Sequence, residues 1–250
     1  MKHSTDKKIS NNIFYVLGIL FILILWFLGF NIFDNDYIIP SVKDTFISLF
    51  ELLKSPYTYT ILLNTLLRLV ISISICFILG VLFGGLSKIS SKFKAFVKPL
   101  FTLLKTAPLM VLIILLLVIF DKNSLYFIVD FVVMPIIYEA TINGLDSIDK
   151  NITEQIKLES NITPYVVGKI YLPLTIPYIS TSLLQSFGLG LKVLVMAEFI
   201  SNADNSIGYE IFFYKDIANE MSYVYAWSII LISFVLVIDI LINYLKKKFA

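Results

Sequence analysis

The chain has 250 residues, of which 58% are hydrophobic and only 15% are charged, and its mean hydropathy is +0.87. Soluble domains carry about 25% charged residues, so the composition indicates an integral membrane protein. The formal net charge of +2 gives no electrostatic case for nucleic-acid binding. The lone histidine, His3, sits in a polar tail, so neither a histidine-based metal site nor a Ser-His-Asp triad is expected. The single cysteine, Cys76, cannot form an internal disulfide.

The apolar runs predict an all-α, polytopic membrane protein with six spanning helices in one domain over residues 1–250. About 20 consecutive apolar residues cross a bilayer, whereas an unpaired strand in lipid leaves its backbone groups unsatisfied. A polar tail, residues 1–12, precedes the first run, which is longer than the core of a signal peptide and is read as an uncleaved span. The expected spans are residues 13–33, 58–86, 99–120, 125–143, 175–200 and 223–245.

Three local patterns refine this layout. Apolar residues at helical spacing between the first two spans predict an amphipathic helix on the membrane surface. They are Val42, Phe46, Leu49, Phe50 and Leu53. Pro108 and Pro135 lie inside the third and fourth spans, where a missing N–H predicts a kink. Glycines in the second and fifth spans permit close helix packing. They are Gly80, Gly84, Gly85, Gly188 and Gly190.

The lysines in the loops predict the orientation. With six spans, both termini and the loops 87–98 and 144–174 share one side of the membrane. That side carries thirteen lysines, against four on the other. Because cytoplasmic loops are enriched in Lys and Arg, we expect both termini and the 144–174 loop to be cytoplasmic.

The polar stretch from Ile148 to Pro177 has the features of two short helices meeting at an elbow. Asn151 is placed to cap the first, with Glu154 at its third position as in a capping box. Thr163 is placed to cap the second, with Pro164 at the first helical position. The pair Leu172-Pro173 is expected to bend that helix toward the fifth span. Capped and proline-bounded, such an elbow is stiff enough to transmit a push.

Together with its flanks MPIIYEATINGLDSID and LPLTIPYISTSLLQSFGLG, this stretch resembles the EAA loop of ABC importer permeases. In that family a Glu-Ala-Ala, a Gly and a Leu-Pro at fixed spacing mark the coupling helix that sits on the ATPase. Counting back from Leu172-Pro173 places Glu154 on the motif's Glu and Ser160 on its Gly. The chain departs from the pattern, because Gln155-Ile156 replaces the two alanines and Ser160 replaces the glycine.

The resemblance covers roughly residues 38–248 and is closest to the sulfonate, nitrate and taurine permeases, whose family also contains carriers of thiamine precursors. Its further pieces are IIPS, NTLLRLVIS, TAPLMVLIILLLVIF, and MAEFIS followed by SIGYEI. It implies a plasma (inner) membrane permease subunit with a cytoplasmic coupling helix, paired with a second identical or homologous permease subunit. Its other implied partners are an ABC ATPase dimer and an extracellular binding protein that delivers a small solute.

ATP is expected on the partner subunit, because the chain contains no G-x-x-x-x-G-K-[ST] loop. The chain is therefore expected to bind no cofactor and to be no enzyme itself. The residues that the resemblance assigns to ATPase coupling are Glu154, Gln155, Lys157, Leu158, Ser160 and Asn161. In the competing interpretation, Glu154 is only a helix cap.

Charged residues inside spans are costly and are candidates for a substrate path. The candidates are Lys192, Glu198, Arg68 and Asp130, with Lys105 and Glu139 near the cytoplasmic face. Snorkelling or structural ion pairing between helices would explain them equally well. Lys192 and Glu198 are six residues apart, about 240° around a helix, so they do not share a face.

Two other classes compete with an importer permease. A secondary transporter or channel would work without an ATPase, and it would have no dedicated docking helix and usually an inverted repeat. A membrane enzyme needs catalytic groups clustered at one depth, whereas the acidic residues here are scattered along the chain.

Overall fold

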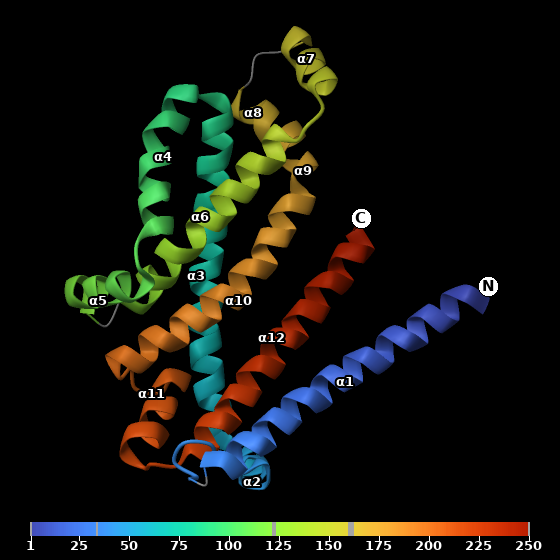
Figure 1. Ribbon diagram of the computed structural model, residues 1–250. Coiled ribbons are helices and arrows are strands. Elements are labelled where there is room, and N and C mark those ends of the chain that lie inside the picture. The colour runs from blue at the N-terminus through green and yellow to red at the C-terminus, as the bar shows by residue number, and fades with distance from the viewer. Residues whose placement is uncertain (1, 34, 122–123, 160–162, 250) are drawn as a thin grey trace. The chain divides into compact units, whose positions relative to one another are not determined.

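The computed structural model describes residues 2–33, 35–121, 124–159 and 163–249, and these residues are helical with short connections (Figure 1). The predicted all-α fold is confirmed, and the described part of the chain contains no strand. The α-helices are α1 (Lys2–Phe33), α2 (Val42–Lys54), α3 (Pro56–Ile89), α4 (Ser91–Thr106), α5 (Leu109–Phe120), α6 (Ser124–Asp146), α7 (Lys150–Glu159), α8 (Pro164–Val166), α9 (Leu172–Leu174), α10 (Ile176–Ser201), α11 (Ile207–Phe212) and α12 (Met221–Phe249). Two π-helical turns, η2 (Val167–Tyr171) and η3 (Phe213–Ile217), complete the set.

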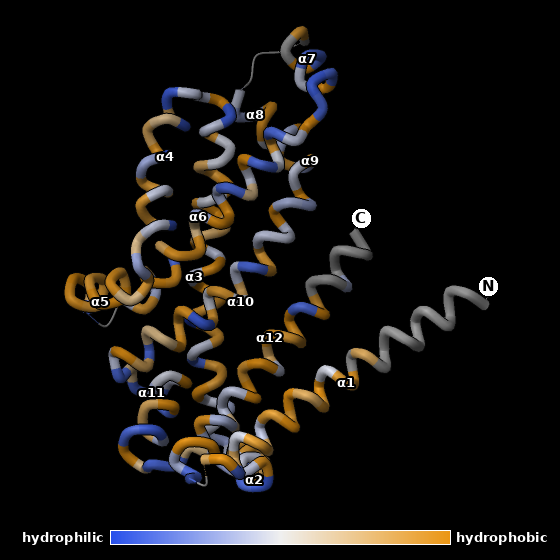
Figure 2. The backbone as a smooth tube through the Cα atoms, in the orientation of Figure 1, coloured by the Kyte–Doolittle hydropathy of each residue, from blue (hydrophilic) through white to orange (hydrophobic). Residues whose placement is uncertain are grey.

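Five of these helices, α1, α3, α6, α10 and α12, are long and apolar enough to cross a membrane. The third expected span, residues 99–120, is not one straight helix. The chain turns by 106° between α4 and α5, so this pair is either one broken span or a re-entrant loop. The turn falls at Ala107-Pro108, where Pro108 lacks the N–H that a continuous helix would need. Figure 2 shows that α5 is hydrophobic along its whole length.

The chain divides into two compact units, residues 1–58 with 210–231, and residues 59–209 with 232–250. In the larger unit, α6 packs lengthwise against α10, and α4 and α5 also contact α6 (Figure 1). The core is apolar, and its fully buried side chains include Leu69 of α3, Ile128 and Ile137 of α6, and Leu194 of α10. Because lipid tails are as apolar as these side chains, close packing rather than transfer from water is what their burial contributes.

Small residues bring α3 and α6 unusually close. A Cβ on Gly84 would lie 2.5 Å from the side chain of Thr141, and one on Gly80 would lie 2.8 Å from that of Ile137. These two glycines have the packing role predicted for them. Gly188 does not, because a Cβ there would meet nothing within 4 Å.

In the smaller unit, α2 is amphipathic as predicted, and most of the apolar residues that defined its predicted face are exposed. Phe50 is 60% exposed, whereas Thr45 and Ser48 are buried. Ser48 hydrogen-bonds Ser222 of α12 at 2.9 Å. The inward face therefore combines two small polar residues with Leu52, and the outward apolar face suits a helix that lies against lipid. Ser41 caps this helix by accepting a hydrogen bond from the N–H of Asp44.

Candidate functional site

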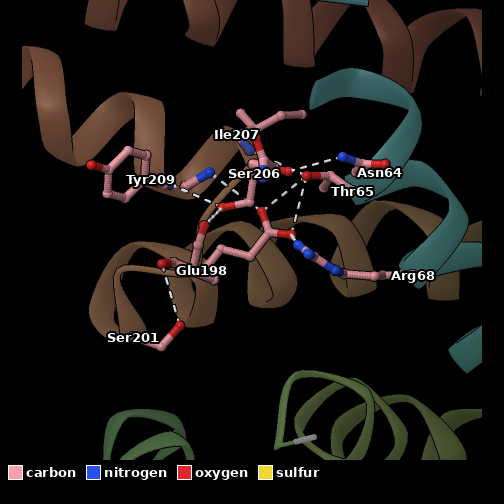
Figure 3. A network of polar contacts seen from close by, with 11 residues as sticks. Asn64, Thr65, Arg68, Glu198, Ser201, Ser206, Ile207 and Tyr209 are labelled. Atoms are coloured by element: carbon pink, nitrogen blue, oxygen red, sulfur yellow. Dashed lines mark hydrogen bonds and ion pairs between the residues drawn. The ribbon is translucent and has the colours of Figure 1, made fainter. Parts of the chain in front are cut away.

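A carboxylate at the end of α10 joins three helices of the larger unit. Glu198 is fully buried. It accepts hydrogen bonds from Thr65 Oγ1 at 3.1 Å, from Arg68 Nη1 at 2.9 Å and from the backbone N–H of Gly208 at 3.3 Å (Figure 3). Thr65 and Arg68 lie one helical turn apart on α3, and Gly208 lies in the first turn of α11. Because a buried charge must be paired and hydrogen-bonded, this cluster is a satisfied ion pair.

The connection between α10 and α11 is built to bring the second helix onto this carboxylate. Asn202 ends α10 in the left-handed conformation, at φ 50° and ψ 46°, which asparagine tolerates well. Ser206 caps α11 by accepting a hydrogen bond from the N–H of Tyr209 at 3.1 Å, and Ile207 donates its N–H to Thr65 Oγ1 at 3.2 Å. The free N–H groups of the α11 N-terminus therefore find acceptors on α3, on α10 and on the connecting segment itself.

Gly208 permits the close approach of α11 to α10. A Cβ at this position would lie 2.5 Å from Glu198 Cβ and 2.5 Å from the carbonyl oxygen of Val195, and closer still to the backbone nitrogen of Phe199. Two of these three atoms are backbone atoms and cannot rotate away. The segment MAEFIS at the end of α10 and the segment SIGYEI at the start of α11 therefore contact each other.

Beside the cluster lies a cavity of about 530 Å³. Arg68 lines it together with the end of α5, the start of α6 and the end of α10. The polar side chains in its wall include Asp121, Ser124, Asn202 and Asp204. Arg68, whose side chain is 22% exposed, therefore links the buried carboxylate to an open space with both polar and apolar walls.

The four candidates for a substrate path separate into different environments. Arg68 and Glu198 form one ion pair, as the structural interpretation of buried charges allowed. Lys192 is exposed on another face of α10, as the helical geometry predicted. Asp130 is half-buried on α6 and accepts a hydrogen bond from the buried thiol of Cys76, with Sγ and Oδ1 3.2 Å apart.

Two further sets of ion pairs involve α4 and α6, and they lie at different ends of α4. Lys105 and Glu139 pair at 2.7 Å, and Lys88 and Lys94 both approach Asp146, at 3.8 and 3.2 Å. The Lys105 and Glu139 side chains are each nearly half exposed. Where such pairs face water, they stabilise a fold by at most about 1 kcal/mol.

The elbow contains the two predicted short helices, with a different cap on the first. The N–H of Asn151 donates to Asp149 Oδ1 at 2.7 Å, and the N–H of Thr153 donates to the Asp149 carbonyl. Asp149, rather than Asn151, therefore caps α7, because a carboxylate one residue before the helix reaches its free N–H groups. Glu154 consequently lies too far along α7 for the predicted capping box, and it is exposed.

The second helix begins as predicted, since Thr163 Oγ1 accepts the N–H of Val166 and Pro164 occupies the first position. It continues through a π turn, η2, and α9 to a turn at Thr175. Pro173 has no N–H to donate to the carbonyl of Lys169, which matches the widening of the helix at this point. Val166, Val167 and Tyr171 pack with Leu145 of α6 in one buried cluster.

The predicted coupling residues lie partly in the described chain. Leu158 is 87% exposed, and Glu154 and Gln155 are also exposed. Lys157 belongs to α7, although its side chain is outside the described part. Ser160 and Asn161 lie outside the described residues.

Sequence reasoning identified Arg68 and Glu198 but missed Thr65 and Gly208 as site residues. Both stand in motifs that carry the resemblance, NTLLRLVIS and SIGYEI. Thr65 could have been found from its spacing, because it lies one helical turn before Arg68 and shares its helix face.

Comparisons with known proteins agree with this architecture. Residues 76–250 match the family model of the binding-protein-dependent transport system inner membrane component. A search of curated proteins finds no match. Among solved structures, a chain of the MetNI methionine ABC transporter in an inward-facing conformation is similar, with a TM-score of 0.66 and 15% sequence identity. The match covers 74% of this chain and 93% of that one. The chain therefore belongs to the family of inner-membrane components of binding-protein-dependent transport systems, and its fold is that of an ABC importer permease.

Proposed function

We propose that this permease is driven by a separate ABC ATPase that docks on α7, and that it carries a small solute delivered by an extracellular binding protein. The observation that supports docking most directly is the exposure of Glu154 and Leu158 on a short, capped helix. A leucine that is 87% exposed contributes little to the fold of the isolated chain. Solvent-exposed apolar residues at a stiff elbow suit a groove on a partner.

The contacts behind α7 support a route for the motion. α8 and η2 are anchored to the end of α6 through the cluster around Leu145 and Tyr171, against which Ile156 of α7 also packs. Beyond Thr175, α10 continues for 26 residues, about 39 Å at 1.5 Å per residue. A push on α7 would therefore reach the Glu198 cluster through a short elbow and one long helix.

This arrangement suggests alternating access. ATP-driven closure of the ATPase dimer would bring the α7 helices of two permease subunits together and open the path outward, and hydrolysis would reset it. The change requires that the ATPase contact α7 differently in the two states. The cavity beside Arg68 would then change shape with the end of α10.

The docking proposal is tested by co-expressing the chain with its ATPase subunit and purifying the complex through a tag on the permease. Glu154→Lys and Leu158→Asp should each reduce the ATPase recovered at least about tenfold, which is about 1.4 kcal/mol of binding. Membrane insertion and the elution volume in detergent should not change. Asp36→Lys is a matched charge reversal at an exposed position far from α7 in the sequence, and it should leave recovery unaltered.

Full recovery with both α7 variants would contradict docking at this helix. Solute uptake that continues without any ATPase would instead support the rival function, a secondary transporter or channel. For the solute, we propose the class carried by the sulfonate, nitrate and taurine permeases and their thiamine-precursor relatives. Thermal shift of the binding protein against a panel of these compounds tests that assignment directly.

A further inference from the structure

An apolar groove runs along the face of α3 that meets the elbow. Two adjoining hollows of about 380 and 360 Å³ share Phe77 and Val81 of α3 with Gly168 and Leu172 of the elbow. The first continues along α3 to Ile89, and the second continues along α10 to Leu183. We call this surface, from Phe77 to Ile89 and from Gly168 to Leu183, the α3–η2 groove.

The groove is open because two glycines face it. A Cβ on Gly168 would meet nothing within 4 Å, so the side of η2 toward the groove is empty space. On the opposite wall, a Cβ on Gly85 would reach only Val167, at 3.5 Å. The π turn also widens the helix here, and such turns occur frequently at functional positions.

The length and lining of the groove match one leaflet of a bilayer. From Phe77 to Ile89, α3 rises about 18 Å, close to half of the roughly 30 Å hydrocarbon core. Exposed apolar side chains flank the groove, among them Ile78 and Leu82 on α3 and Ile176 on α10. An acyl chain therefore has a continuous apolar wall to lie on.

An aromatic and a basic residue directly follow, in the sequence, Pro164 and Gly168, which line the groove. Tyr165, 73% exposed, and Lys169, also exposed, lie four residues apart on the elbow. Tyrosine and lysine are typical of the level of the lipid headgroups. None of the ion pairs found among the described residues includes Lys169. The ammonium group is therefore available for an anionic headgroup.

We propose that the α3–η2 groove binds an anionic phospholipid, with one acyl chain against Gly168 and the phosphate near Lys169. If the elbow is cytoplasmic, as we propose, the lipid comes from the leaflet in which anionic lipids are enriched. The bound chain would fill the space between α3 and η2 and brace the segment that joins α7 to α10.

The test is photolabelling of the full chain in lipid nanodiscs. The probes are phosphatidylglycerol and phosphatidylcholine that carry a diazirine on one acyl chain, and labelled peptides are mapped by mass spectrometry. Phosphatidylglycerol should label residues 77–89 and 164–172 at least about fivefold more than phosphatidylcholine. Gly168→Leu should remove that labelling, because the new side chain occupies the groove. Gly188→Leu, at a glycine with equally open surroundings on α10, should not.

Lys169→Gln separates the headgroup from the acyl chain. It should abolish the preference for phosphatidylglycerol while phosphatidylcholine labelling stays the same, and Lys98→Gln, at another exposed lysine, should preserve the preference. Equal labelling by the two wild-type probes would overturn the proposal, as would labelling that survives Gly168→Leu. Cross-linking of the groove to α1 of a second copy would also overturn it. The readout is lipid contact alone, so it does not depend on transport.

Discussion

Adding a single methyl group at Gly208 should disrupt the contact between α10 and α11. The alanine Cβ would sit 2.5 Å from both Glu198 Cβ and the Val195 carbonyl oxygen, well inside the 3.5–4.0 Å at which carbon atoms pack. The start of α11 would have to move by about 1 Å or more. That movement would lengthen the hydrogen bond from the Gly208 N–H to Glu198, now 3.3 Å.

The cost follows from three effects. Overpacking a tight contact costs about 1–3 kcal/mol, and losing a hydrogen bond to a charged group costs about 1.5–3 kcal/mol. Alanine is preferred over glycine in a helix by about 1 kcal/mol, which offsets part of this. The net expectation is about 2–5 kcal/mol, or a fall in melting temperature on the order of 10 °C.

The measurement is a thermal melt of the detergent-purified chain followed by size-exclusion chromatography. Gly188→Ala is the matched control, because a methyl group there meets nothing within 4 Å. A double-mutant cycle of Gly208→Ala with Glu198→Gln should be clearly non-additive, since both changes act on one hydrogen bond. If Gly208→Ala melts within about 2 °C of Gly188→Ala, the description of this contact is wrong.

Three further predictions concern the described helices. Arg68→Ala should lower the free energy of unfolding by about 3–5 kcal/mol in the same melt, because it leaves the buried Glu198 unpaired. Adding Glu198→Gln should recover part of that loss, and additive losses would exclude the pairing. Burial raises the pKa of Glu210 above its ordinary 4.5, although a hydrogen bond with Tyr57 acts in the opposite direction. The folded state therefore holds its proton more tightly than the unfolded state, and this contribution to stability is complete below 4.5 and lost as the pH rises through the folded pKa. As the pH rises through this range, the melting temperature of the unsubstituted protein should fall, and that of Glu210→Gln should fall less. Identical pH profiles for the two proteins would refute the assignment. Gly84→Ala should cost about 1–3 kcal/mol through a 2.5 Å clash with α6, whereas Gly85→Ala, with an ordinary 3.5 Å contact, should cost little; equal melts would argue against close packing here.

The helical membrane fold was predictable because long apolar runs leave the chain few alternatives in lipid. The 106° turn between α4 and α5 was less so. The missing N–H of Pro108 predicted a kink, but the angle between α4 and α5 depends on what each helix packs against. The apolar face of α2 was predictable from its helical spacing, whereas the hydrogen bond of Ser48 with Ser222 was not, because these residues are far apart in the sequence.

The candidate site was predictable in its members more than in its pairing. Charges inside spans are candidates for function, and this criterion named Arg68 and Glu198 together with Lys192 and Asp130, which lie elsewhere in the structure. Arg68 and Glu198 are 130 residues apart, so local pattern could not join them. At the elbow, Thr163 and Pro164 act as predicted. Asp149 caps α7 where Asn151 was predicted. Either side chain can cap a helix, and the sequence does not show at which of the two the helix begins.

The burial of Cys76 has a practical consequence for studying motion in this transporter. It is the one thiol in the sequence, and its side chain is fully enclosed between α3 and α6. Thiol-reactive dyes and spin labels should therefore not react with Cys76 while the protein is folded. A cysteine introduced at Leu158 would be labelled selectively, with no need for a cysteine-free background. Pairs of probes on two subunits could then follow the distance between the elbows during ATP turnover.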